Sequence, residues 1–163
     1  MAIPDYNYQS LKDVSKIKDF LLEDLATIMF IESGGNRLAY SGSHVGPFQL
    51  SEETGKSLIT PTSDARIDTR RSAEVAIDYY ENNLRDKVFY TKPDGSEHSW
   101  SLSKQYKKAG INKKVAGYIG HQQGRSGLID IITAIDSDKL GLETKKNMLN
   151  NMGLTDKDGN KTL

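Results

Sequence analysis

Apolar residues recur every three or four positions along most of the chain, which is the spacing that places them on one face of a helix. The first such run extends over residues 11–33 and ends at two glycines, 34–35. It predicts one long helix, with a candidate break at residues 16–18. A second run covers residues 69–87, and Asp68 directly before it is the expected N-cap.

The remaining helices are predicted to be shorter. One begins at Ser51 and is closed by Gly55. The second half of the chain predicts four more, over about residues 102–109, 112–123 (capped by Asn112), 127–136 and 142–152. The sequence therefore predicts a mainly α protein of six to seven helices.

Two segments between these helices lack a helical pattern. Residues 34–48 are rich in Gly and Ser and predict a loop. Residues 88–90 and 98–100 flank a Lys-Pro-Asp-Gly turn at 92–95, so they form either one small β-hairpin or a plain loop. The last residues, 153–163, make up a polar tail.

Length and composition favour a single globular domain over residues 1–163. The chain has no cysteine, which excludes disulfides, cysteine-ligated metals and thiol chemistry. The three histidines show no metal-ligand spacing, so no cofactor and no metal is expected. Lys and Arg total 22 and Asp and Glu total 22, so the chain lacks the basic excess that is typical of nucleic-acid binders.

The N-terminal residues lack the pattern of an export signal. Residues 1–11 are polar and nearly uncharged, and no run of about 18 apolar residues occurs anywhere. We therefore expect a protein made in the cytoplasm that does not insert into a membrane.

Glu32 is the most informative candidate for chemistry. It lies four residues after Ile28 and seven after Leu25, so it projects from the apolar face of the first helix. Loss of hydration on such a face raises the pKa of a carboxyl group, and a general acid needs a raised pKa. The alternative is a structural glutamate that binds loop amides beyond the helix end.

The residues around Glu32 resemble the lytic transglycosylase and goose-type lysozyme superfamily. The resemblance rests on Glu-Ser-Gly at 32–34, Ser41, Gly-Pro-Phe-Gln at 46–49 and the segment 118–124, and it covers about residues 20–128. The chain departs from the family where His121 replaces the usual tyrosine and Gln122 the usual asparagine. The spacing from Glu32 to Gln49 is also one residue shorter. The resemblance implies a lysozyme-like fold.

The resemblance also implies cleavage of the β-1,4 bond between N-acetylmuramic acid and N-acetylglucosamine in peptidoglycan. Glu32 would protonate the leaving oxygen and then take the proton of the muramoyl C6 hydroxyl, which gives a 1,6-anhydro sugar. The implied substrate-binding residues are Ser41, Gln49, Tyr118, His121 and Gln122. Their alternatives are a turn serine for Ser41, a buried amide tying the loop to the helix for Gln49, and a core histidine for His121. Either Tyr118 or His121 would contact Glu32.

Residues 33–51 contain no Asp or Glu, which favours this one-carboxylate route over hydrolysis. The alternatives are a hydrolytic muramidase and, in another class, a non-catalytic glycan-binding or structural virion module. Peptidoglycan lies outside the cytoplasm, so two routes fit. One is a bacteriophage endolysin or virion-associated lysin, released through a holin or carried with tail proteins. The other is a bacteriolytic effector that is secreted and has an immunity protein.

Overall fold

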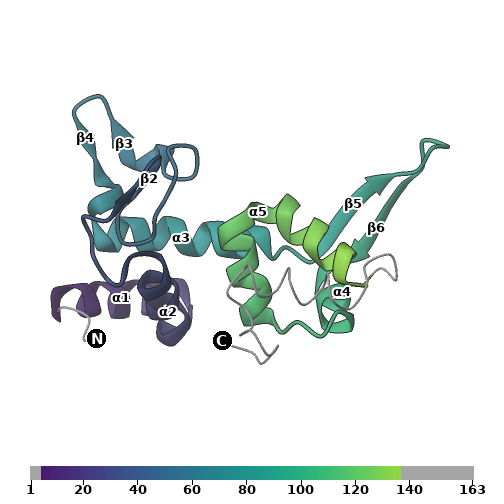
Figure 1. The fold of residues 1–163 in the computed structure, drawn as a ribbon, viewed down its shortest axis with the longest axis horizontal. Helices are drawn as coiled ribbons and strands as arrows, with labels where there is room; N and C mark the ends of the chain where they lie inside the picture. The colour runs from purple at the N-terminus through teal and green to yellow at the C-terminus, as the bar shows by residue number, and fades with distance from the viewer. Residues whose placement is uncertain (1–4, 137–163) are drawn as a thin grey trace. The chain divides into compact units, whose positions relative to one another are not determined.

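The structure is a computed structural model, and it describes residues 5–136 of the 163-residue chain. The described part is mainly helical, as the apolar spacing predicts (Figure 1). It divides into two compact units between Tyr80 and Glu81. The single lysozyme-like domain stays a prediction.

The first unit begins with two helices, α1 (Asp5–Lys18) and α2 (Leu22–Ser33). The segment predicted over residues 11–33 is therefore not one continuous helix, and its candidate break at 16–18 lies next to the observed one, because the chain leaves the helical conformation at Asp19, whose φ is 51°. The hydroxyl of Ser15 donates to the carbonyl of Phe20, and the Phe20 amide donates to the Ser15 carbonyl, 3.0 Å away. These two bonds hold the turn just beyond the candidate break.

The third helix, α3 (Thr69–Asn83), begins where the apolar pattern predicts. The Asp68 carboxylate accepts a hydrogen bond from the Arg71 amide at 2.8 Å, which confirms Asp68 as the cap. The helix ends earlier than the predicted residue 87, because Lys87 already belongs to a β-strand.

Buried apolar side chains of all three helices make up most of the core of the first unit. They include Leu11 and Val14 of α1, Leu25, Ile28 and Met29 of α2, and Ala73, Ala76 and Ile77 of α3. One polar residue is buried with them: the Asn7 side-chain amide donates to the Gly35 carbonyl at 3.3 Å and accepts from the Thr69 hydroxyl at 2.7 Å. Asn7 thus joins α1 to the end of α2 and to the start of α3.

Two short antiparallel hairpins follow α2. The first is β1 (Tyr40–Ser41) with β2 (His44–Val45), inside the segment predicted as a plain loop. The second is β3 (Ile59–Thr60) with β4 (Ser63–Asp64), flanked by the short 3₁₀ helices Lys56–Leu58 and Ala65–Ile67. The helix predicted at residues 51–55 is only a single turn, closed by a bond from the Gly55 amide to the Ser51 carbonyl at 2.9 Å.

The second unit combines a hairpin with two helices. Strands β5 (Lys87–Thr91) and β6 (Glu97–Ser101) pair antiparallel, so the hairpin alternative is correct. Helix α4 (Leu102–Lys108) follows, and then α5 (Lys113–Asp136), which contains both helices predicted at 112–123 and 127–136. Gly124, with φ 69° and ψ 176°, separates them by a kink, and Figure 1 shows that α5 changes direction along its length.

The predicted cap of α5 is confirmed, since the Asn112 side-chain oxygen accepts from the Val115 amide at 2.9 Å. The core of the second unit is a cluster of apolar side chains from α4, α5 and the turn between them, with Leu102, Ile119, Leu128 and Ile132 fully buried. The predicted helix at 142–152 and the polar tail lie outside the described residues. No helix between residues 5 and 136 is long and apolar enough to cross a lipid bilayer.

Candidate active site

Glu32 lies in the last turn of α2, one residue before the helix ends at Ser33. Its side chain is half-buried and continues the face formed by the buried Leu25 and Ile28. Gly34 ends the helix in the left-handed conformation, with φ 62°, and its amide donates to the Phe30 carbonyl at 2.8 Å. Glu32 is therefore at the point where a rigid helix meets the loop.

Ser33, the neighbour of Glu32, ties the two sequence motifs together. Its hydroxyl oxygen lies 2.8 Å from the Pro47 carbonyl and 3.0 Å from the Met29 carbonyl, and it accepts from the Gly35 amide at 3.2 Å. Pro47 belongs to the Gly-Pro-Phe-Gln segment, which is fourteen residues further along the chain. The structure thus brings the Glu-Ser-Gly and Gly-Pro-Phe-Gln motifs into direct contact.

Gln49 stabilises the loop through its side-chain amide nitrogen. This nitrogen donates to the carbonyls of Ala39 at 3.1 Å and Gly46 at 2.9 Å, and the Gln49 backbone has a positive φ of 46°. The amide thus ties the loop to itself, whereas the structural alternative expected a tie to the helix. Within residues 5–136, both side-chain hydrogen bonds of Gln49 are donated by its amide nitrogen. Its side-chain oxygen can therefore accept a hydrogen bond from another donor.

The first hairpin after α2 presents exposed side chains. Ser41, a predicted substrate-binding residue, is exposed in β1 and pairs with His44. Tyr40 beside it is 73 % exposed, a large fraction for an aromatic side chain. Sequence reasoning missed Tyr40 because it lies in a Gly- and Ser-rich loop without an apolar period. The sequence feature that could have identified Tyr40 is its aromatic side chain directly before the candidate Ser41.

A buried arginine, which sequence reasoning also missed, stabilises the loop from its other side. The guanidinium of Arg66 donates to the Asp64 carboxylate at 2.6 and 2.9 Å, to the Leu50 carbonyl at 3.0 Å and to the Ser43 carbonyl at 3.3 Å. Arg66 is only 5 % exposed. Its hydrogen bonds join the ends of the segment that contains the Gly-Pro-Phe-Gln motif to strand β4.

The charges of this pair stabilise each other. Hydrogen bonds from Arg66 are the main reason why the pKa of Asp64 is lower than its usual value. The Asp64 carboxylate in turn raises the pKa of Arg66, against the opposing effect of burial. Asp64 is therefore ionised and already bound by a guanidinium.

The other predicted site residues belong to the second unit and lie on α5 before its kink. Tyr118 is half-buried and packs against the apolar cluster of that unit, and His121, one helical turn later, is also half-buried. Gln122 is exposed. Contact of Tyr118 or His121 with Glu32 stays a prediction.

Comparisons of the chain with protein-family models, curated proteins and solved structures find no match. Within residues 5–136, no group of three or more His, Asp or Glu side chains is arranged to hold a metal ion. The candidate site therefore consists of Glu32 and the loop that Ser33, Gln49 and Arg66 hold.

Replacing Gly46 by alanine will disrupt this loop. Gly46 has a φ of 87°, and an added Cβ would lie 1.9 Å from the Arg66 carbonyl oxygen, which is backbone and cannot move aside cheaply. We expect G46A to lower the free energy of unfolding by about 2–4 kcal/mol. Gly42→Ala is the matched control, because Gly42 has a φ of 61° but nothing within 4 Å of an added Cβ. G42A should cost about 1 kcal/mol in the same urea titration, and equal losses would contradict the steric explanation.

Asp64→Asn will show a pH-dependent loss of stability. Because the pKa of Asp64 is lowered in the folded chain, its charge stabilises the fold above the unfolded pKa, and this stabilisation is lost as the pH falls through the folded pKa. We expect D64N to be less stable by about 1 kcal/mol near neutral pH, a modest value because Asp64 is partly exposed.

The difference in free energy of unfolding between wild type and D64N should shrink as the pH falls below about 4. Urea unfolding at several pH values measures it, with the exposed Glu53→Gln as the control. A difference between wild type and D64N that stays constant down to the acid limit would show that Asp64 acts through packing rather than through its charge.

Proposed function

We propose that the chain is a peptidoglycan lytic transglycosylase that cleaves the β-1,4 bond between N-acetylmuramic acid and N-acetylglucosamine. One observation carries the proposal. The hydrogen bond from Ser33 to the Pro47 carbonyl, 2.8 Å long, joins the two motifs of the family resemblance at the helix end that carries Glu32. This contact supports the proposal because it places both motifs of the resemblance at one helix end, beside the candidate acid.

Glu32 acts as both acid and base in this proposal. It donates a proton to the glycosidic oxygen, and the bond between that oxygen and the muramoyl C1 breaks as positive charge develops at C1. The Glu32 carboxylate then accepts the proton of the C6 hydroxyl of the same sugar while that oxygen bonds to C1. The helix end supports this role because it holds Glu32 half-buried beside a braced loop.

The acids near the loop support a route with one carboxylate. A hydrolase with two carboxylates needs a second acid about 5–10 Å from the first, positioned to act on C1 or on a water molecule. Asp64 is bound on both oxygens by Arg66, at 2.6 and 2.9 Å, and Glu52 and Glu53 are exposed in the turn after the loop. The pairing of Asp64 with Arg66 favours the anhydro product over hydrolysis.

The remaining predicted residues keep substrate-binding roles in the proposal. Ser41 and the side-chain oxygen of Gln49 offer hydrogen bonds to sugar hydroxyl or acetamido groups, and the exposed Tyr40 adds an apolar surface for a sugar ring. Tyr118, His121 and Gln122, which belong to the second unit, keep the substrate-binding role that the resemblance implies for them. We also propose that the enzyme reaches the cell wall by one of three routes: release during phage lysis, transport with a virion, or secretion.

Glu32→Gln will abolish the release of 1,6-anhydro-muropeptides from purified sacculi. Glutamine keeps the shape of the side chain but neither donates nor accepts the proton, so we expect the rate to fall at least about a hundredfold. Mass spectrometry of the digest identifies the anhydro ends, because they are lighter by one water than reducing ends. Glu53→Gln, an exposed acid of the same type, should keep wild-type activity.

Other products of that digest would change the assignment. Reducing ends released by the wild type, and lost in E32Q, would make the chain a hydrolytic muramidase. Glycan binding without turnover, unchanged in E32Q, would make it a non-catalytic glycan-binding module.

A further inference from the structure

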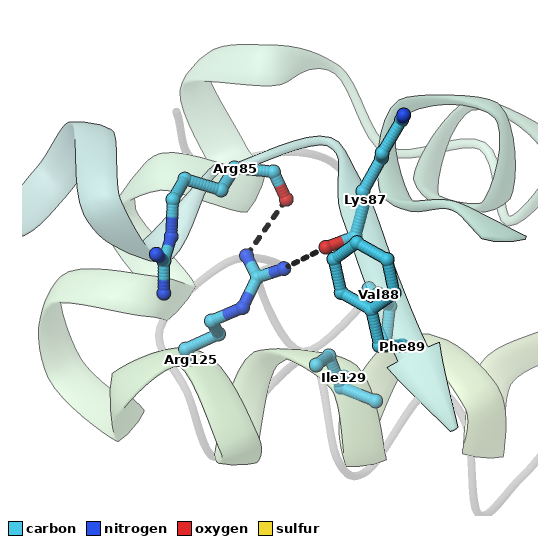
Figure 2. Close-up of a pocket in the computed structure, with 6 residues that line it drawn as sticks. All are labelled: Arg85, Lys87, Val88, Phe89, Arg125 and Ile129. Carbon is cyan, nitrogen blue, oxygen red and sulfur yellow. Dashed lines mark hydrogen bonds between the residues drawn. The ribbon is translucent and has the colours of Figure 1, made fainter. Parts of the chain in front are cut away.

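The second unit contains a pocket that has no role in the proposed cleavage. It has a volume of about 420 Å³, within the range of small-molecule sites. The start of β5 and the part of α5 beyond the kink form it, and its lining consists of Arg85, Lys87, Val88, Phe89, Arg125 and Ile129 (Figure 2). Three of these six side chains are cations.

Arg125 is held rigidly at this pocket. Its guanidinium donates to three backbone carbonyls, those of Asn83 at 2.9 Å, Arg85 at 2.7 Å and Lys87 at 2.8 Å. Figure 2 shows the guanidinium between the Arg85 and Lys87 carbonyls, with the Arg85 side chain on one side of it and the Lys87 side chain extending away from it on the other. A guanidinium has five N–H donors, so two remain for a ligand.

None of the cations at this pocket forms an ion pair with a carboxylate of the described residues. The ion pairs between residues 5 and 136 are Lys18–Asp78 and Arg66–Asp64, both in the first unit. Asp86, the acid next to Arg85, accepts hydrogen bonds from Ser101 and from the Ser103 amide, at 2.9 Å each, so it is engaged by β6 and α4. Burial and the charge of Arg85 both lower the pKa of Arg125, as expected for cations that lack a counter-ion.

The other half of the lining is apolar. Val88 and Ile129 are half-buried, and Phe89 is 71 % exposed. A free inorganic anion would use the cations but would gain nothing from these three side chains. A ligand that fits the whole lining has a negative group and an apolar group directly beside it.

We propose that this pocket binds the terminal carboxylate of a short peptide whose last side chain is small and apolar. The planar carboxylate matches the side-by-side N–H donors of a guanidinium, which bind it through two parallel hydrogen bonds. The apolar side chain of the peptide then lies against Val88 and Ile129. This inference stands on the second unit alone and does not depend on the proposed cleavage.

Titration of the full chain with N-acetyl-alanyl-alanine tests the proposal. Trp100 is the only tryptophan of the chain and pairs with Val88 in the hairpin, so its fluorescence reports on the pocket wall. We expect the dipeptide to bind and its C-terminal amide to bind at least about tenfold more weakly, because the amide lacks the charge. Equal binding of the two, or no binding of the dipeptide, would overturn the proposal.

Variants identify the site. Arg85→Gln and Lys87→Gln are exposed substitutions that should leave the fold intact, as circular dichroism checks, and each should weaken dipeptide binding about fivefold or more. Lys92→Gln, in the turn of the same hairpin and outside the pocket, is the matched control and should bind like the wild type. Unchanged binding in both R85Q and K87Q would refute the location.

Inorganic phosphate is the remaining probe. If the apolar wall contributes, phosphate should bind more weakly than the dipeptide and displace it only at higher concentration. Displacement by phosphate at equal concentration would show a general anion pocket and would overturn the assignment to a peptide carboxylate.

Discussion

The candidate site depends on one buried cation, the guanidinium of Arg66. A charge that is only 5 % exposed is costly to bury unless it is paired and hydrogen-bonded, and all three guanidinium nitrogens of Arg66 donate, to one carboxylate and two backbone carbonyls. Those carbonyls belong to Ser43 and Leu50, at the two ends of the segment that carries Gln49. Because Ser33 binds the same segment from the helix side, the loop beside Glu32 is braced at both of its faces.

Local signals in the sequence predicted most of the helices and their caps. Asp68 and Asn112 cap as expected because an N-cap needs only a side chain and amides two or three residues away. The break between α1 and α2 was predicted at residues 16–18, just before the observed Asp19, and the kink at Gly124 falls in the predicted gap between residues 123 and 127. The exact positions could not be predicted, because an aspartate or a glycine inside an apolar period does not show by itself that it takes a positive φ.

The candidate site was predictable in part. Glu32 stands out because its helical face is apolar, and the structure bears out its position at the end of α2. Arg66 and Tyr40 were missed for a different reason. The guanidinium of Arg66 contacts residues 16 and 23 positions away, and such pairings leave no period in the sequence. Gly46 and Gly55 were the sequence features related to Arg66 here: an added Cβ at either position would collide with Arg66, so glycine is favoured at both.

The hydrogen bonds of Asn7 have a consequence for the order in which the chain acquires its structure. Asn7 contacts Gly35 and Thr69, partners that follow it by 28 and 62 residues. During synthesis α1 therefore emerges long before either partner exists, and its buried amide stays hydrated until residue 69 has been made. Closing so long a segment costs chain entropy that short helical contacts do not. The end of α2 and the loop beside Glu32 thus acquire these contacts only after residue 69 has been made.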